Sequence, residues 1–174
     1  TTAAPGATTS STSSPTASPV TPAASDTAAP TAEKLYGTWE QCEQDGSASS
    51  LTAYTFDKLS EIELSIGYRL DNYPTSDCSG QSTSYLSQNG VAELKGEKKT
   101  VDGANVVKLH RKAKRGFSAS RATLSNGTWV VGGKPVNDPD KLVLTLSDSG
   151  LRVGNKGDVD ADGFPTQLRP GVFK

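Results

Sequence analysis

Methionine is absent from the 174-residue sequence, histidine occurs once, and cysteine occurs only twice. Because the chain begins with Thr1 and lacks methionine, we expect it to be the processed remainder of a longer translation product. No apolar run approaches the roughly 18 residues of a membrane-spanning helix, and no signal-peptide core remains. The formal net charge of −1 gives no electrostatic reason to expect nucleic acid as a partner, since nucleic-acid-binding domains are usually strongly basic.

The residue patterns that carry most enzyme chemistry are also missing. The only histidine, His110, has no evident nucleophile partner, and no serine lies in a Gly-x-Ser-x-Gly elbow. No glycine-rich phosphate-binding loop occurs. Glu61 and Glu63 fall on the outward face of an alternating strand, where solvated charge is the rule. The sequence therefore predicts a protein without catalytic activity.

Composition changes abruptly near residue 33. Residues 1–32 consist almost wholly of Thr, Ser, Ala and Pro, with Asp26 as the only charge and Val20 as the only larger apolar residue. Such a segment cannot bury enough apolar surface to offset its conformational entropy, so we expect a disordered stalk over 1–32. Residues 33–174 are long enough to form one domain with a hydrophobic core.

Short stretches with a period of two predict β-strands throughout this domain. In the clearest stretch, Glu61–Leu70, apolar and polar residues alternate strictly. The predicted strands are Leu35–Gln41, Leu51–Phe56, Glu61–Leu70, Ser82–Leu86, Ala104–Leu109, Ala119–Leu124, Thr128–Val131, Lys141–Leu146, Leu151–Val153 and Gly171–Lys174. At most one short helix is expected, over Ala92–Lys99.

Turn residues agree with this strand pattern. Asn126-Gly127 separates two strands and is the strongest two-residue hairpin signal, because both positions of that turn need positive φ. Asp148-Ser149-Gly150 separates two further strands. Eight to ten short strands without a helical period predict an all-β fold, an antiparallel up-and-down barrel, because closure removes exposed strand edges.

The two cysteines, Cys42 and Cys78, lie in polar, turn-like surroundings. An even number of cysteines beside a Ser/Thr/Pro-rich stalk favours a disulfide and an oxidising compartment. Closing a loop of this length would stabilise the fold by ~4 kcal/mol through lost chain entropy. The alternative is a pair of reduced, unrelated thiols.

The start of the folded region resembles that of lipocalin-like small barrels. Gly37-Thr38-Trp39 follows Leu35-Tyr36, as the Gly-x-Trp of that family opens its first strand. The resemblance implies that Gly37 and Trp39 plug the closed end of the barrel, with a basic side chain, Arg152 or Arg169, across the indole.

The layout also resembles two bacterial groups. In uncharacterised lipid-anchored envelope proteins, a low-complexity stalk precedes a small barrel that begins Gly-Thr-Trp-x-x-Cys, which Gly37, Thr38, Trp39 and Cys42 match. Some bacterial inhibitors of secreted metalloproteases share a mobile N-terminal arm, an eight-stranded barrel and one disulfide. These resemblances imply an envelope or secreted protein, with membrane association through an N-terminal lipid anchor.

Three sets of side chains are candidates for binding. Apolar residues on one face of Glu61–Leu70 are expected to line a cavity for an apolar or amphipathic ligand: Ile62, Leu64, Ile66 and Tyr68. Carboxylates at alternate positions before Gly163 resemble the start of a calcium loop: Asp158, Asp160 and Asp162. Calcium is therefore the one cofactor considered, although the twelfth position holds Arg169 instead of glutamate, and an ordinary acidic hairpin loop is the alternative.

The third set is basic. Strand alternation places Lys108, His110 and Lys112 on one face, expected to be the solvent side. Such a strand edge serves to discourage edge pairing, or it binds an anionic partner such as a lipid head group or an acidic protein surface.

Together these features predict a non-catalytic binding module of the cell envelope that holds an apolar or amphipathic small molecule. The alternative is a protein-binding module whose partner is an envelope or secreted protein, such as a secreted-protease inhibitor or a calcium-dependent surface protein. A carrier needs a cavity inside the barrel, whereas an inhibitor fills its barrel and binds through its arm or loops.

Overall fold

The computed structural model describes residues 1–2 and 31–174, apart from Asn137 and the side chains of Glu97 and Lys98. The predicted stalk over 1–32 therefore lies almost entirely outside the described residues. The described domain opens with a single helical turn, α1 (Ala32–Leu35). All remaining regular structure in the described residues is β-strand, so the predicted all-β class is confirmed.

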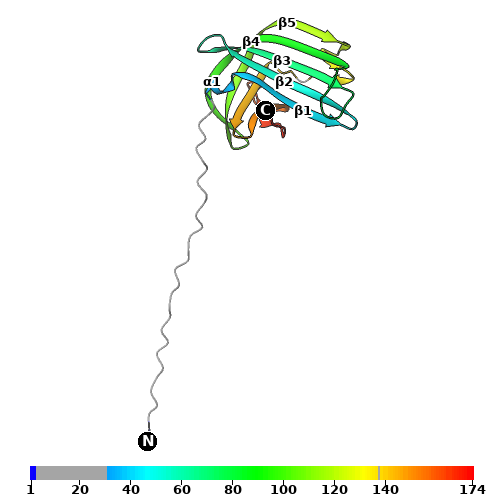
Figure 1. The fold of residues 1–174 in the computed structure, drawn as a ribbon. Helices are drawn as coiled ribbons and strands as arrows, with labels where there is room; N and C mark the ends of the chain where they lie inside the picture. Colours follow the sequence, from blue (N-terminus) through cyan, green and yellow to red (C-terminus); the bar gives the residue numbers. More distant parts are fainter. Residues whose placement is uncertain (3–30, 137) are drawn as a thin grey trace.

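Eleven strands follow α1 along the chain (Figure 1). They are β1 (Gly37–Asp45), β2 (Ala48–Lys58), β3 (Glu63–Tyr73), β4 (Ser84–Val101), β5 (Ala104–Ser120), β6 (Ala122–Ser125), β7 (Thr128–Val131), β8 (Lys134–Pro135), β9 (Lys141–Ser147), β10 (Gly150–Val159) and β11 (Pro165–Leu168). Eight of them form one curled antiparallel sheet in the order β1-β2-β3-β4-β5-β9-β10-β11. The other three, β6, β7 and β8, form a small sheet of their own.

The curled sheet closes on itself through the C-terminal residues. Leu151 of β10 exchanges two backbone hydrogen bonds with Phe173, at 2.9 and 2.8 Å. Lys174 exchanges two with Glu40 of β1, both at 2.9 Å. This short segment, which we call the closing tail (residues 171–174), therefore lies between β10 and β1 and joins the two sides of the barrel, where a short last strand is predicted.

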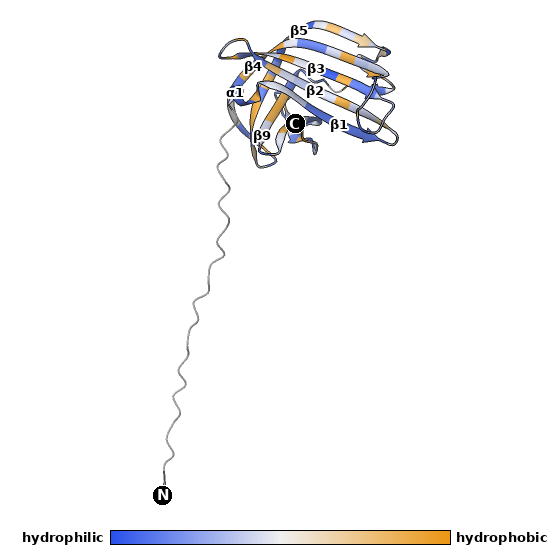
Figure 2. Cartoon of the chain, viewed as in Figure 1, coloured by the Kyte–Doolittle hydropathy of each residue, from blue (hydrophilic) through white to orange (hydrophobic). Residues whose placement is uncertain are grey.

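The interior of the barrel is filled with side chains. Hydrophobic and hydrophilic residues alternate along the strands (Figure 2), so that each strand buries one face. The largest fully buried side chains are Tyr54, Phe56, Phe173, Leu35, Leu64, Ile66, Leu86, Leu109, Leu142, Leu144, Leu151 and Val106. Tyr54 is the hub of an aromatic cluster, with its ring centroid 5.3 Å from that of Tyr68 and 5.4 Å from that of Phe173.

A second, smaller core lies outside the barrel. The β10–β11 hairpin folds over the outer face of the sheet, where Phe164 and Leu168 pack with Val101, Val106 and Val143. β10 changes partner within its own length: Gly150 to Val153 pair with β9, and the residues from Gly154 onward pair with β11. Because the β10–β11 hairpin covers part of the outer face of the sheet, it determines which basic residues of that face are exposed.

Two local predictions have opposite outcomes. The turn at Asn126-Gly127 has φ values of +47° and +76°, as the predicted hairpin requires, and it joins β6 to β7. The predicted helix over Ala92–Lys99 is wrong, because these residues belong to β4. Ala92 pairs with Leu64 of β3 on one side and with Arg111 of β5 on the other, so tertiary pairing outweighs local helix propensity.

The predicted disulfide is present between Cys42 of β1 and Cys78 of the β3–β4 connection. Ser49 anchors the same connection, since its hydroxyl donates to the Thr75 carbonyl at 2.7 Å and accepts from the Cys78 N–H at 2.8 Å. The disulfide thus ties a long connection to the first hairpin of the barrel.

Candidate functional site

One end of the barrel is closed by α1 and the start of β1. The Trp39 indole N–H donates to the Leu35 carbonyl at 2.8 Å, and its ring packs, half-buried, against the main core. Gly37 has φ +117°, which favours glycine, although a Cβ there would meet nothing within 4 Å. Its role is therefore to provide a backbone conformation that other residues rarely adopt.

Neither candidate arginine covers the Trp39 indole. Among the described residues, the cation–π contacts involve other rings. Arg152 donates from Nε and Nη2 to the Arg169 carbonyl, at 3.2 and 3.0 Å, and so fixes the chain just before the closing tail. Arg169 itself lines a pocket at the other end of the barrel.

The predicted ligand-facing set is wrong at Ile62. Ile62 lies in the β2–β3 turn, just before β3, and is 60% exposed. The other three residues of the set lie in β3 and are buried: Leu64 and Ile66 are 0% exposed and Tyr68 is 2% exposed. A side chain that lined a cavity wide enough for water would retain accessible surface. Leu64 and Ile66 therefore fill the barrel and line no apolar cavity.

The end of the barrel remote from α1 carries a pocket of about 350 Å³, which we call the mouth pocket. Its walls come from β1, β2, β3, β8, β10 and the residues before and within the closing tail. The lining residues are Glu43, Ser50, Thr52, Tyr68, Leu70, Lys134, Pro135, Asn155, Arg169, Pro170 and Gly171. Ser50 and Thr52 continue the inward-facing series of Tyr54 and Phe56, so the pocket opens onto the inner side of the sheet.

A buried chain of hydrogen bonds supports this pocket. The Ser50 hydroxyl donates to Asn72 Oδ1 at 2.8 Å, and Asn72 Nδ2 donates to the Ser84 hydroxyl at 3.0 Å and to the Val131 carbonyl at 3.1 Å. These bonds connect β2, β3 and β4 to the small sheet. Because each buried polar group has a partner, the network holds the pocket wall in one arrangement.

The mouth pocket has basic groups on two sides. Lys134 donates to the Ser50 hydroxyl at 3.3 Å and pairs with Asp45 at 2.8 Å, which lowers the pKa of Asp45. Arg169 lies close enough to the buried phenol of Tyr54 to act on it electrostatically, although burial dominates and raises the pKa of Tyr54. One acid, Glu43, also lines the pocket.

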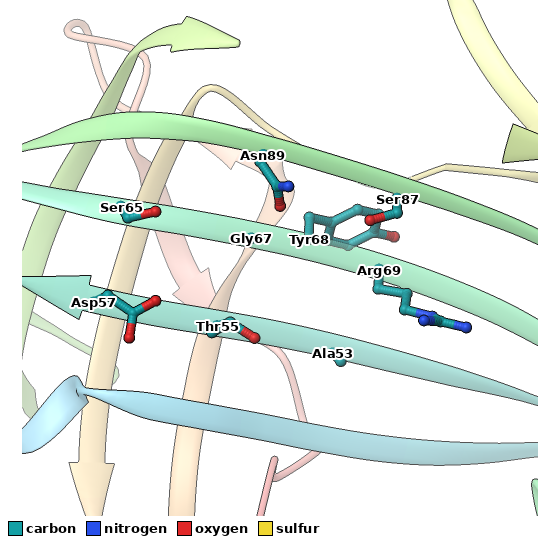
Figure 3. A pocket seen from close by; sticks show the side chains of 9 residues that line it. All are labelled: Ala53, Thr55, Asp57, Ser65, Gly67, Tyr68, Arg69, Ser87 and Asn89. Carbon is teal, nitrogen blue, oxygen red and sulfur yellow. The ribbon is translucent and has the colours of Figure 1, made fainter. Parts of the chain in front are cut away.

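A second hollow of about 350 Å³ lies on the outer face of β2, β3 and β4 (Figure 3). Its floor is made of small residues, including Ala53, Thr55 and Gly67, and Asp57 and Arg69 lie at its two ends. Its residues lie on the open outer face of the curled sheet, and its lining side chains form no acid–base or nucleophile arrangement.

The predicted calcium loop is built as a hairpin turn. Asp160 Oδ1 accepts the backbone N–H of Asp162 at 3.1 Å and of Phe164 at 2.8 Å, and its other oxygen pairs with Lys99. These donors lower the pKa of Asp160 to about 2, with the Lys99 hydrogen bond as the largest cause. Among the described residues, no three acidic, histidine or cysteine side chains gather as metal ligands, so Asp158, Asp160 and Asp162 do not converge.

The predicted basic face is only partly on the solvent side. Lys108 is 3% exposed, because the β10–β11 hairpin covers it and its ammonium lies 4.5 Å from the centre of the Phe164 ring. Lys112 is exposed and pairs with Glu93 at 3.0 Å. His110 is half-buried and lines a separate hollow on the outer face, together with Lys95 and Lys141.

The sequence did not predict the buried ion pair between Arg111 and Asp138. Arg111 and Asp138 form an ion pair at 2.5 Å, with side chains 0% and 4% exposed. Arg111 Nε and Nη2, Asp138 Oδ1 and Tyr54 Oη are buried without hydrogen-bond partners among the described residues. The only sequence signal was Arg111 itself, a charge that follows the apolar Leu109 at a spacing of two.

None of the helices in the described part of the chain has the length and apolar character to cross a bilayer.

Comparison with known proteins finds no relative of this chain. No protein-family model, no curated protein and no solved structure matches it.

Proposed function

We propose that this protein is a non-catalytic binding module of the cell envelope whose ligand enters the mouth pocket. The observation that carries the proposal is the pocket's position, on the inner side of the sheet at the barrel end remote from α1. The filled core leaves no room for a ligand deeper in the barrel. A ligand would therefore rest on the rim of the core.

The lining favours a small amphipathic molecule with an acidic group. Tyr68 and Leu70 offer an apolar floor, and Lys134 and Arg169 offer cationic donors above it. About 350 Å³ is near the lower end of the volumes that protein ligand pockets have, about 300–1,000 Å³. Glu43 opposes a second negative charge on the ligand, which favours a monoanion.

The cell envelope is proposed on separate grounds. The Cys42–Cys78 disulfide is typical of proteins that mature in an oxidising compartment. The Thr/Ser/Pro-rich composition of residues 1–32 is typical of a tether, and the resemblance to lipid-anchored barrels implies an anchor before Thr1.

The test is titration of the oxidised full chain with 8-anilinonaphthalene-1-sulfonate, a fluorescent amphipathic monoanion. We expect saturable one-to-one binding that Arg169→Gln weakens about tenfold, because a charge-assisted hydrogen bond is lost. Lys114→Gln is the matched control, since Lys114 is exposed on β5 and pairs with Asp140 at 3.2 Å, away from the pocket. Equal affinity in all three proteins would contradict the mouth pocket as the site.

A protein-binding module is the second candidate, and the filled core favours it. After Arg111, the edge of β5 that faces β9 has no strand partner among the described residues. In this part of β5 the exposed ring of Phe117 stacks on Trp129, with the ring centroids 4.7 Å apart. Inhibition of a zinc metalloprotease such as thermolysin by the full chain, lost in Phe117→Ala and retained in Arg169→Gln, would support this candidate. Absence of any inhibition would remove the protease-inhibitor form of it.

A further inference from the structure

A hollow of about 500 Å³ lies on the outer face of the barrel, away from the mouth pocket. We call it the basic hollow, and it is lined by Lys95 of β4, His110 of β5, Lys141 of β9, and Ala161, Asp162 and Phe164 of the β10–β11 turn. Four separate parts of the chain therefore contribute to it.

Strand register brings the cationic residues together. His110 pairs directly with Lys141 of β9 and with Glu93 of β4, and Lys95 pairs with Lys108. The row between them, Leu94, Leu109 and Leu142, faces the core, so both flanking rows face outward. The side chains of Lys95, His110 and Lys141 consequently reach the same patch of outer surface.

The aromatic wall of the hollow is held in place by buried contacts. Phe164 is 5% exposed and packs in the outer core with Val143, and its ring lies over the ammonium groups of Lys108 and Lys141. Its backbone N–H is fixed by Asp160. A site with a fixed wall loses little conformational entropy when a ligand binds.

The charge balance around His110 leaves a cation available. Glu93 is shared between Lys95 and Lys112, both at 3.0 Å, and these two lysines lower the pKa of Glu93. Asp160 pairs with Lys99 and lies 3.9 Å from Lys108. Within the described residues Lys141 forms no ion pair; its ammonium contacts the Asp162 carbonyl and faces the hollow.

We propose that the basic hollow binds an oxyanion of the phosphate class, with Lys95, His110 and Lys141 as donors. The oxyanion is a free phosphate or the phosphate of a lipid head group, since both present the same oxygens. Asp162 lines one side of the hollow and limits the site to one such group. The proposal is independent of the mouth pocket and stands whether or not that pocket binds a ligand.

The first experiment is NMR titration of the oxidised full chain with inorganic phosphate, followed by vesicles with and without phosphatidylglycerol. We expect saturable shifts of the His110, Ala161 and Phe164 amides, with Ser50 and Thr52 of the mouth pocket unmoved. Lys141→Gln should weaken phosphate binding about tenfold, whereas Lys156→Gln, an exposed lysine of β10 outside the hollow, should not change it. Shifts that are equal in Lys141→Gln and the unmodified chain would overturn the site. Binding to the phosphatidylglycerol vesicles alone would identify the lipid form, and binding to phosphate alone the soluble form.

The second experiment tests the role of His110 with sulfate at a single pH. An imidazole ring N–H can donate a hydrogen bond to a sulfate oxygen. The charged groups that face the ring are Glu93 and Lys95 of β4, Lys141 of β9, Asp162 of the turn, and Lys108 and Lys112 of its own strand. His110→Ala should weaken sulfate binding several-fold, whereas Lys156→Gln should leave it unchanged. Equal sulfate affinity in His110→Ala and the unmodified chain would exclude His110 as a donor.

Discussion

Among single residues, the Arg111–Asp138 pair shows how costly a buried charge is when part of its hydrogen-bonding capacity is unused. One guanidinium nitrogen meets Asp138, while Nε and Nη2 have no partner among the described residues. A buried ion pair is weak evidence for stability, because desolvation opposes the attraction between the charges, but removing one partner leaves the other unpaired.

Breaking this pair on one side should destabilise the protein strongly. Asp138→Leu leaves the Arg111 guanidinium buried without a counter-charge, so we expect a loss of about 3–5 kcal/mol of unfolding free energy in urea denaturation. Arg111→Met combined with Asp138→Leu removes both charges and should recover most of that loss. A double variant that is less stable than Asp138→Leu would show that the ion pair itself is net stabilising.

Gly150 is a position where glycine is required twice over. Its φ is +128°, and a Cβ there would overlap the Phe173 carbonyl oxygen. Gly150→Ala should therefore lower the unfolding free energy by about 2 kcal/mol or more. Gly96→Ala, where a Cβ meets nothing within 4 Å, is the control and should be neutral or slightly stabilising. Thermal unfolding followed by circular dichroism compares the two.

At the scale of single elements, a prediction from sequence succeeds where the strand's own period determines which side chains face inward. Alternation correctly placed Leu64, Ile66 and Tyr68 inside, because β3 is a regular strand whose facing is set by its own period. Ile62 continues the same alternation in sequence, but it lies in the β2–β3 turn, because β3 begins only at Glu63. Its side chain is therefore not held on the inner face of the sheet.

The remaining errors have non-local causes. Lys108 is buried by the β10–β11 hairpin, whose Phe164 lies more than fifty residues later in the sequence, and no local sequence pattern predicts this contact. Arg111 finds its partner 27 residues away. The mouth pocket likewise depends on Arg169 and Pro170 meeting β2 and β3, which only the closed barrel brings together. The disulfide was predictable because two cysteines allow a single intramolecular pairing.

The β10–β11 hairpin should respond to acid through Asp160. Its pKa is lowered from 3.8 to about 2 in the folded protein, so its contribution to stability is present above pH 4 and is lost as pH falls toward 2. Asp160→Asn should reduce the urea midpoint at pH 7 and flatten its decline between pH 4 and 2. An unchanged pH profile in that variant would separate the hairpin from acid unfolding.

The β3–β4 connection should depend on its disulfide. Replacing Cys42 and Cys78 with serine frees a loop closed over a sequence separation of 36 residues. We expect a loss of ~4 kcal/mol in unfolding free energy, from the larger entropy of the unfolded chain. The urea midpoint of the double-serine variant should match that of the reduced native sequence; a clear difference between them would implicate local strain from the substitution.

For the whole molecule, the closing tail is the feature on which barrel closure depends. Phe173 is fully buried against Tyr54, and the backbone of residues 173–174 bonds to both β1 and β10. Removing Phe173 and Lys174 should cost about 3–5 kcal/mol for the lost aromatic side chain and leave two unpaired strand edges. Size-exclusion chromatography should then detect association of the truncated chains, whereas Lys174→Ala, which keeps the backbone bonds, should remain unchanged.

The closing tail also bears on circular permutation of this domain. Lys174 pairs antiparallel with Glu40, so a chain continuing beyond it would run toward Gly37, where the domain begins. The C-terminal residue therefore lies beside β1, the first strand of the domain, and circular permutation is favoured when the two termini of a domain are close together. A short linker from Lys174 to Thr31, with new termini opened at the Asn126-Gly127 turn, would make closure of the ring a local event in sequence.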